Sequence, residues 1–448
     1  MTTAERLYGL FMKSSGVNTD SRTIKEGEMF FALKGENFDG NAYADKALEK
    51  GAAFAIVSAD SDAAKASCTD GRIIPVEDTA AALKDLARLH RCSMEVDGRR
   101  LPVIGLTGTN GKTTTKELIN AVLSVKYRVT ATQGNLNNEI GVPLSLLKIT
   151  PQTQIAVIEM GASHPGDIKS LVSVSMPDYG IITNVGKGHL LGFGSFEAVK
   201  KTKGELYDYI RQSGGKIFIN QDIPYLKEMA EERGIDDVIP YGTDYDGARI
   251  LPLSEENPYL RMEIPVSCSE SYTLETHLAG QYNAANVMAA LSVGRFFNVP
   301  EKEALHAIAS YIPANSRSQI ERTGRNLLIV DAYNANPVSM EAALSNLEEM
   351  PAERKVVMLG DMLELGKDSA AEHDNVVSKV AGMGLQCAMF VGSEFGAALK
   401  RSGSRGNFFH FDDSGLLARY LKTHTLSGCT ILIKGSRGTR MEKAIAEL

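Results

Sequence analysis

The sequence predicts an α/β protein of three domains: a mixed α/β N-terminal domain, a central domain with a P-loop-type parallel sheet, and a C-terminal Rossmann-like domain. The chain has 448 residues, about three times a domain length of roughly 150. Short apolar strands alternate with amphipathic helices in two separate stretches, a pattern typical of parallel sheets covered by helices. A glycine-rich turn at 107–113 also joins a buried strand to a helix.

The composition indicates a protein with ordinary cores and excludes several classes. Hydrophobic residues make up 43% and charged residues 23%, so the chain is neither disordered nor collagen-like. A net charge of -7 predicts no general attraction for nucleic acid or an anionic membrane. The five cysteines are scattered and lack a Cys-x-x-Cys pair, which predicts free thiols in a reducing compartment. With no leader pattern and no long apolar run, we expect a soluble, cytoplasmic protein.

The N-terminal domain is expected to span residues 1–98. Its pattern is mixed, with short strands at 29–33 and 53–57 and a helix at 80–91. The polar, glycine-containing segment 96–100 follows this helix, and we place the first domain boundary there.

The other two domains, 99–312 and 313–448, each repeat strands and helices. In the central domain, buried strands are expected at 103–106, 155–159 and 180–183, helices at 113–124 and 284–297, and antiparallel strands within 244–272. The C-terminal domain is expected to be a doubly wound unit. Its predicted strands are 327–330, 356–359, 388–391, 408–411 and 431–433, and its predicted helices are 339–349, 370–381 and 415–423.

The most informative motif is Thr107-Gly108-Thr109-Asn110-Gly111-Lys112-Thr113, followed by Thr114. Two glycines allow a tight turn whose N–H groups converge on an anion, and the helix N-terminus adds partial positive charge. The lysine can reach the β and γ phosphates and the threonine hydroxyl can ligate Mg²⁺. The motif is shorter than the usual phosphate loop, and an incidental glycine-rich turn is the alternative interpretation.

Two further residues follow buried strands in this domain. Glu159 ends an apolar strand, where α/β sheets bind ligands, so it could hold Mg²⁺. An edge carboxylate exposed to water is the alternative. His189 follows a strand and a glycine-rich segment, but Mg²⁺ prefers oxygen ligands and a histidine in such a place is more often a loop residue than a ligand.

These motifs together resemble the Mur ligases, ATP-dependent ligases of cell-wall (peptidoglycan) precursor synthesis. The resemblance covers nearly the whole chain in the expected order. It implies ATP and Mg²⁺ as cofactors, with Thr113, Glu159 and His189 at the metal. It also implies that Lys203 is carried as a carbamate, an extra anionic metal ligand. A solvated basic helix face is the alternative for Lys203, because Lys200 and Lys201 lie beside it.

Within this family, two stretches resemble the branch that adds D-alanyl-D-alanine to UDP-MurNAc-tripeptide. One is the asparagine-rich loop with Asn135, Asn137 and Asn138, for which capping of the next helix is the alternative role. The other is Asp331-Ala-Tyr-Asn-Ala-Asn-Pro337. The resemblance implies that Asp331 binds the ATP ribose and that Tyr333, Asn334 and Asn336 shape the closed site.

Three more stretches fit the resemblance. Asn283 would contact adenine, although Tyr282 stands where histidine is frequent in the family. Arg317 would reach the ATP phosphates, and Lys434 would face the site. In the N-terminal domain, Ser21, Arg22 and Gly40 would hold the UDP end, with Asn41 where histidine is usual.

The family reaction implied for this chain forms an acyl phosphate from ATP, which the amine of D-alanyl-D-alanine then attacks. Lys112, Glu159, His189, Lys203 and Arg317 would be its catalytic residues, and the enzyme is expected to be a monomer. A sister ligase adding another amino acid and a nucleotide switch that hydrolyses without ligation are the alternatives. A two-domain folate ligase is disfavoured by the nearly hundred residues before the phosphate loop.

Overall fold

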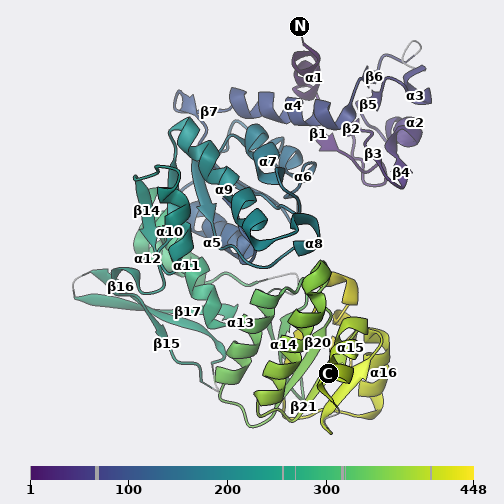
Figure 1. Cartoon of the computed structure of the whole chain (residues 1–448). Coiled ribbons are helices and arrows are strands. Elements are labelled where there is room, and N and C mark those ends of the chain that lie inside the picture. The colour runs from purple at the N-terminus through teal and green to yellow at the C-terminus, as the bar shows by residue number, and fades with distance from the viewer. Residues whose placement is uncertain are drawn as a thin grey trace.

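The computed structural model describes residues 2–65, 70–254, 257–267, 269–313, 317, 319–403 and 406–448. Three parallel or largely parallel sheets follow one another along the chain, each with its own helices (Figure 1). The fold class is confirmed. The predicted boundaries at 98/99 and 312/313 stay predictions; they fall in the turn between β7 (Glu95–Val96) and β8 (Arg99–Arg100) and in the segment between α12 (Glu301–Ala309) and β18 (Gln319–Arg322).

The N-terminal unit is a four-stranded parallel sheet in the order β1-β2-β5-β6. Its strands and helices are β1 (Gly16–Asn18), β2 (Glu28–Phe31), β5 (Phe54–Ser58), β6 (Ile73–Val76), α1 (Thr3–Phe11), α2 (Ala44–Glu49), α3 (Asp62–Lys65) and α4 (Thr79–Ser93), with a small hairpin of β3 (Lys34–Gly35) and β4 (Phe38–Asp39). Asp78 caps α4 by accepting from the N–H groups of Ala80 and Ala81.

The central sheet is entirely parallel, in the order β10-β11-β9-β12-β13-β14. Its strands are β9 (Val103–Thr107), β10 (Val129–Ala131), β11 (Ile155–Glu159), β12 (Tyr179–Ile182), β13 (Lys216–Asn220) and β14 (Val238–Tyr241). Its helices are α5 (Lys112–Ser124), α6 (Gly141–Leu146), α7 (Asp167–Ser175), α8 (Leu190–Phe193), α9 (Phe196–Ser213), α10 (Pro224–Glu231), α11 (Ala284–Phe296) and α12. The chain leaves β9 toward β10 on one side and later reaches β12 on the other. The loop after β9 therefore lies at a topological switch point, where open α/β sheets bind ligands.

Alternation along β9 divides the central core into two layers. Val103 faces the layer that contains α6, α7, α9 and α10, whereas Ile104 faces the layer that contains α5, α11 and α12. An antiparallel sheet of β15 (Arg249–Leu251), β16 (Tyr259–Ser267) and β17 (Glu270–Ala279) follows and projects at the left of Figure 1. The antiparallel strands expected within 244–272 are thus present, although β17 runs further, to Ala279.

The C-terminal sheet has the order β18-β19-β23-β20-β21-β22. Its strands are β18, β19 (Leu327–Asp331), β20 (Lys355–Gly360), β21 (Cys387–Val391), β22 (Phe408–Phe411) and β23 (Thr430–Lys434), and its helices are α13 (Pro337–Glu349), α14 (Ser369–Gly382), α15 (Ser393–Ser402), α16 (Ser414–Thr423) and α17 (Glu442–Ile445). One expectation was wrong. The strand at 327–331 is not the first of this domain, because β18 precedes it and pairs with it antiparallel. The polar run Gln-Ile-Glu-Arg of β18 lacks the apolar signature of the other strands, as an edge strand can.

Of the cysteines, Cys92, Cys387 and Cys429 are free thiols, as predicted, and Cys68 and Cys268 lie outside the described residues. Across the described ranges, none of the helices combines the length and apolar character needed to cross a bilayer.

The N-terminal and central units share one continuous hydrophobic core, which includes Leu83 and Leu86 of α4 as well as Leu146 of α6 and Leu171 of α7. A buried ion pair reinforces this joint. Arg91 of α4, which is fully buried, donates to Asp178 at 2.8 Å, and Asp178 also pairs with Arg100. The long helix α4 is therefore an integral part of both units (Figure 1).

We predict that Asp178→Ala lowers the free energy of unfolding by about 3 kcal/mol, because it leaves the buried Arg91 guanidinium without its carboxylate. Urea denaturation followed by circular dichroism measures the change. Asp237→Ala is the control, since it removes an exposed partner of Lys216 and should cost less than about 1 kcal/mol. Equal losses in the two variants would contradict the assigned role of the joint.

Candidate active site

The carboxyl ends of three neighbouring strands bring the predicted phosphate loop and its partners together. In the β11-β9-β12 order, Glu159 pairs in register with Leu106, and Thr107 pairs with Ile182. The residues that follow β9, β11 and β12 therefore meet at one edge of the sheet. Local sequence placed each residue after a strand, and the strand order makes them neighbours.

The phosphate loop has the backbone that its glycines allow. Gly108 and Gly111 have φ values of 154° and 77°, and a Cβ on Gly108 would lie 1.8 Å from Thr183 Oγ1. Asn184 fixes the loop from the neighbouring strand end, because its Oδ1 accepts from Asn110 N–H at 2.9 Å and its Nδ2 donates to Asn110 O at 3.1 Å. Asn184 was not predicted as a site residue, although it begins the glycine-rich segment that leads to His189.

Lys112 begins α5 and folds over its own loop. Its Nζ donates to Gly108 O at 2.8 Å and Thr109 O at 3.1 Å. Burial lowers the pKa of Lys112 from its usual value, and Arg317 adds to this effect, while Glu159 opposes it. The Lys112 ammonium is thus held at the loop close to Arg317, and a bound anion would offset the repulsion between these two positive charges.

Glu159 is buried rather than exposed at an edge, with an exposed fraction of 1%. Its Oε1 accepts from Thr113 Oγ1 at 3.2 Å and Asn137 Nδ2 at 2.8 Å. Within the described part of the chain, its Oε2 is buried and has no hydrogen-bond partner. A buried carboxylate oxygen left open beside a phosphate-loop threonine hydroxyl fits a magnesium ion, which prefers oxygen ligands. No group of three or more His, Cys, Asp or Glu side chains suited to a metal occurs in the described ranges.

Lys203 does not lie on a solvated face. Only 3% of it is exposed, and its Nζ donates to Gly108 O at 2.9 Å. Burial lowers the pKa of Lys203 well below its usual value, and Lys112 contributes in the same direction. The neighbouring Lys201 is exposed. Burial thus sets Lys203 apart from its neighbour, which sequence spacing alone did not reveal.

His189 carries a left-handed backbone, with φ of 53°, and reaches across to the C-terminal domain. Its Nδ1 lies 2.5 Å from Glu364 Oε2, so Nδ1 donates to that carboxylate and Nε2 is the nitrogen with a lone pair. Burial lowers the pKa of His189, and Lys112 and Lys203 lower it further, although Glu364 acts in the opposite direction. The neutral ring that these effects favour is the form that ligates metals.

The C-terminal domain presents its own strand ends to the phosphate loop. In the order β19-β23-β20, Asp331 pairs in register with Lys434, whose Nζ lies 2.5 Å from Asp331 Oδ2. Asn336 caps α13 and forms a reciprocal amide pair with Asn110, at 2.7 and 3.4 Å. Arg317 stacks over the ring of Tyr333 at 3.6 Å. The two sheets therefore face each other through their carboxyl edges.

Between these edges lies a cleft of about 620 Å³, a size typical of ligand sites. The predicted residues that line it are Thr109, Asn110, Gly111, Lys112, Thr113, Thr114, Asn135, Asn137, Glu159, His189, Asn283, Arg317, Asp331, Tyr333, Asn334, Asn336 and Lys434. Lining residues that were not predicted include Asn184, Asn286, Val338, Leu363 and Glu364.

The remaining predicted residues lie elsewhere. Thr107 ends β9 and Gly108 begins the loop, and Lys203 donates to Gly108 O; these three residues are not among those that line the cleft. Asn138 is not among the residues that line the cleft, and its Oδ1 accepts from the N–H groups of Ile140 and Gly141 where α6 begins. Asn283 lines the cleft, and its amide also bonds to Ala279 O and Asn286.

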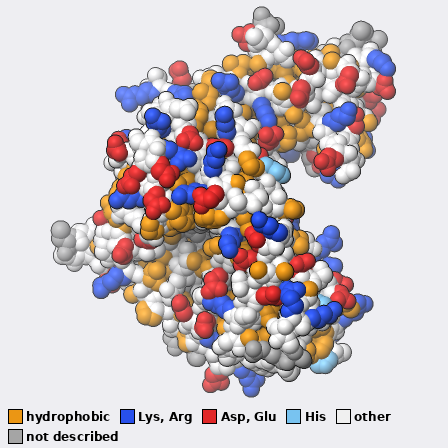
Figure 2. All heavy atoms as spheres, in the orientation of Figure 1, with side chains coloured by type: hydrophobic (Ala, Val, Ile, Leu, Met, Phe, Trp, Pro, Cys, Tyr) orange, Lys and Arg blue, Asp and Glu red, His pale blue; other side chains and the backbone are white. Residues whose placement is uncertain are grey.

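Ser21, Arg22 and Gly40 belong to the N-terminal unit, away from the cleft. Figure 2 shows a wide hollow at the right, between the N-terminal lobe at the top and the rest of the molecule. Arg22 is bound to Asp20 at 2.7 Å, and a Cβ on Gly40 would lie 2.5 Å from Leu33 O. The sequence thus places two separate regions of interest on the molecule.

Such a cleft, with a phosphate loop and a buried carboxylate on one sheet facing a second parallel sheet, defines a nucleotide-binding α/β enzyme. Comparison with known families agrees. Residues 13–91 match the description "Mur ligase family, catalytic domain", residues 106–294 the Mur ligase middle domain, and residues 316–437 the "Mur ligase, glutamate ligase domain". The chain belongs to the Mur ligase family, whose members are ATP-dependent ligases.

Relatives of similar length share a common name. The UDP-N-acetylmuramoyl-tripeptide--D-alanyl-D-alanine ligase of Escherichia coli (strain K12) is 34% identical, over 99% of this chain and 95% of that protein. The ligase of the same name from Bacillus subtilis (strain 168) is 33% identical, over 97% of this chain and 93% of that protein.

Solved structures agree with this similarity. A crystal structure of MurF from Acinetobacter baumannii has a TM-score of 0.84 at 28% identity, covering 99% of this chain and 98% of that one. MurF ligase from Thermotoga maritima in complex with ADP has a TM-score of 0.82 at 26% identity, covering 98% of this chain and 97% of that one.

We predict that Lys112→Ala lowers turnover by at least about a hundredfold, because it removes a preorganised cation from the phosphate loop. ATP-dependent phosphate release measures the effect. Lys126→Ala, just beyond the far end of α5, is the matched control and should retain activity, since its Nζ donates to the carbonyls of Phe297 and Asn298 and lies over the Tyr127 ring, and Lys126 is not among the residues that line the cleft. Substantial turnover in Lys112→Ala would remove this residue from the phosphate site.

Proposed function

We propose that this protein is the cytoplasmic, monomeric ligase that joins D-alanyl-D-alanine to UDP-N-acetylmuramoyl-tripeptide at the expense of ATP, in peptidoglycan precursor synthesis. The observation that carries this proposal is the cleft in which residues 331–336 face the phosphate loop, including the Asn110–Asn336 amide pair. The relatives named for this reaction match the chain over almost its full length.

The charges around the cleft suit a nucleotide triphosphate. Lys112 and Arg317 would offset the charge on the γ-phosphoryl group during its transfer, and the loop N–H groups would bind the other phosphates. Asp331 would bind the ribose and Asn283 the adenine. Lys434 holds Asp331 through a direct ion pair, which fixes that carboxylate at the end of β19.

Glu159, Thr113 and His189 would hold Mg²⁺. The open Oε2 of Glu159 and the Nε2 of His189 support this assignment. When bound, the ion neutralises phosphate charge and so favours phosphoryl transfer.

The proposed reaction has two steps. The carboxylate of the tripeptide attacks the γ-phosphorus of ATP, the bond to the β-γ bridging oxygen breaks, and an acyl phosphate and ADP form. The free amine of D-alanyl-D-alanine then attacks the acyl carbon, and the tetrahedral intermediate expels inorganic phosphate, with loss of a proton from nitrogen. Water would hydrolyse the acyl phosphate, so contact between the C-terminal and central domains protects the intermediate.

The two regions of interest suit a long substrate. Ser21, Arg22 and Gly40 would hold the UDP end, and Asn135, Asn137, Tyr333, Asn334 and Asn336 would meet the peptide end at the cleft. Because the N-terminal and central units share a core, the distance between the two regions is fixed. A fixed distance favours a substrate of defined length.

We predict that phosphate release from Mg-ATP requires both UDP-MurNAc-tripeptide and D-alanyl-D-alanine. The measurement is phosphate release with each substrate supplied and omitted, together with the product mass, which should rise by the dipeptide minus one water. Release that needs neither substrate would indicate a nucleotide switch. A requirement for the nucleotide sugar with a different amino acid would indicate a sister ligase.

We also propose that Lys203 is a carbamate in the working enzyme. A neutral amine is the form that attacks CO₂, and the burial that lowers the pKa of Lys203 favours this form. The resulting anion would stand beside the positive charge of Lys112.

We predict a carbamate carbonyl signal in the ¹³C NMR spectrum of the enzyme supplied with ¹³C-bicarbonate. Lys203→Gln should lack the signal and lose about a hundredfold in turnover, as expected when a charge-stabilising group is removed. Lys201→Gln, on the exposed side of the same helix, should keep both signal and turnover. A signal that persists in Lys203→Gln would refute the assignment.

A further inference from the structure

A direct contact between the central and C-terminal domains joins two residues with unusual backbones. His189 Nδ1 lies 2.5 Å from Glu364 Oε2, and Leu191 N–H donates to Glu364 O at 3.0 Å. His189 and Glu364 both have left-handed backbones, with φ of 53° and 66°. Residues other than glycine rarely adopt this backbone conformation, so contacts with surrounding residues must stabilise it.

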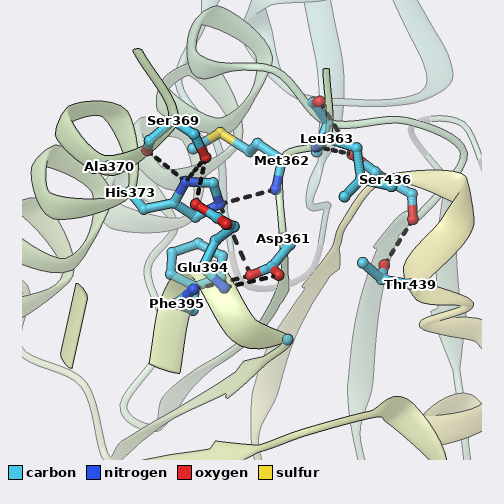
Figure 3. A network of polar contacts seen from close by, with 12 residues as sticks. Asp361, Met362, Leu363, Ser369, Ala370, His373, Glu394, Phe395, Ser436 and Thr439 are labelled. Carbon is cyan, nitrogen blue, oxygen red and sulfur yellow. Dashed lines mark hydrogen bonds and ion pairs between the residues drawn. The ribbon is translucent and has the colours of Figure 1, made fainter. Parts of the chain in front are cut away.

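The segment just before Glu364 is held by side chains of two other elements (Figure 3). Met362 N–H donates to His373 Nε2 of α14 at 3.1 Å, and Leu363 N–H donates to Ser436 Oγ, after β23, at 2.9 Å. Met362 is almost completely buried. Two successive backbone N–H groups, of which that of Met362 is buried, thus find their acceptors on α14 and after the end of β23.

The His373 ring is oriented so that it can only accept from Met362. It is fully buried, and its Nδ1 lies 2.7 Å from the backbone oxygen of Ser369. A carbonyl oxygen accepts, so Nδ1 carries the proton and Nε2 presents a lone pair. The ring edge of Phe395 packs against it, with centroids 4.6 Å apart.

The neighbouring carboxylates are engaged elsewhere. Asp361 accepts from the N–H groups of Glu394 and Phe395 at 3.1 and 2.9 Å, at the start of α15, and its Oδ1 lies 3.8 Å from His373 Nε2. Glu394 accepts from Ser369 Oγ at 2.6 Å. The network of Figure 3 therefore fixes both ends of α14's first turn and the strand end that leads into Met362.

We propose that His373 is a positioning residue for the reaction. It holds the 362–364 segment in the conformation that brings Glu364 to His189, and so fixes the C-terminal domain against the phosphate-loop side of the cleft. Leu363 and Glu364 line the cleft, whereas His373 lies behind them in the domain core. The neighbouring Glu372 of α14 pairs with Lys187 at 2.8 Å, which places a second interdomain contact on the same helix.

The proposal rests on the proposed function only for its kinetic readout. His373→Leu removes the acceptor of Met362 N–H, so the segment should relax and Glu364 should leave His189. We expect kcat to fall about tenfold, a change of about 1.4 kcal/mol in the barrier. Glu364→Ala should lose a similar factor.

A double-mutant cycle separates positioning from general destabilisation. If His373 acts through Glu364, the double variant should lose about tenfold, as each single variant does, and not about a hundredfold. His90→Leu is the matched control, because His90 is also buried and bonds to Ile149 O at 2.8 Å, but at the N-terminal joint. The fold-loss in kcat of His90→Leu should multiply with that of Glu364→Ala in the double variant. If the fold-losses of His373→Leu and Glu364→Ala also multiply in their double variant, the proposal is overturned.

Two conservative variants keep the test decisive if His373→Leu folds poorly. A Gln oxygen can reach the position of Nε2 and accept from Met362, whereas Asn reaches only the Nδ1 position, near Ser369. We expect His373→Gln to retain most activity and His373→Asn to lose about tenfold in kcat, as His373→Leu does. Thermal unfolding should show that both variants are folded. Equal activities of the two folded variants would overturn the proposal.

A readout that does not depend on substrates distinguishes this inference from the proposed function. With Mg-ADP, small-angle X-ray scattering should give the same radius of gyration for wild type and His373→Gln, and a larger one for His373→Asn. Identical radii for all three would overturn the positioning role. If the radius is larger for His373→Asn than for wild type, but the wild type does not ligate, the positioning role stands and the proposed function is refuted.

Discussion

The position of the phosphate loop, at the carboxyl end of a buried strand that lies between two parallel neighbours, is the constraint on which the rest of this structure depends. Strand β9 is completely buried, and the loop after it has room only for glycine at position 108, beside Thr183. The strand order then forces Glu159 and His189 to the same edge. Buried cations and a buried carboxylate remain there because each charge offsets another or faces the cleft. Positive charges therefore lie close together at the site before any ligand binds, which favours the binding of a negatively charged nucleotide.

The central domain contacts the N-terminal unit and the C-terminal domain through interfaces of different chemistry, and this difference indicates different roles for the two interfaces. The N-terminal joint is apolar and continuous, with one core running from α4 into α6 and α7. The C-terminal domain has its own cores, and across the cleft it meets the central domain through polar contacts such as Asn110–Asn336, His189–Glu364 and Lys187–Glu372. Polar contacts exchange readily with water, whereas an apolar core does not. The N-terminal joint therefore fixes a distance, and the C-terminal contact is the one suited to opening and closing.

Much of the fold followed from local pattern. The strand at 155–159 begins and ends where its apolar run predicted it, because buried parallel strands are continuously apolar. The edge strand at 408–411 also has its predicted bounds, although it is only half-buried. The antiparallel strand β18 was missed because its residues are mostly polar and half exposed. In the site, the phosphate loop was recognisable because its glycines and lysine are adjacent in sequence. The assignment of Asn138 to the substrate stays a prediction, and its Oδ1 accepts from the Gly141 N–H where α6 begins, since an asparagine-rich loop offers the same amide groups for either use.

The sequence by itself determined many of the apolar elements, their order, the phosphate loop and the family resemblance, because each depends on residues close together in the chain. Only the tertiary structure decided which side chains those elements bring into contact. Glu364 meets His189 across 175 positions of sequence, and Lys203 is buried beside Gly108 while Lys201 on the same helix is exposed. His373 accepts from Met362 because α14 packs against the end of β20. Such contacts depend on strand order and domain placement, which no local periodicity encodes.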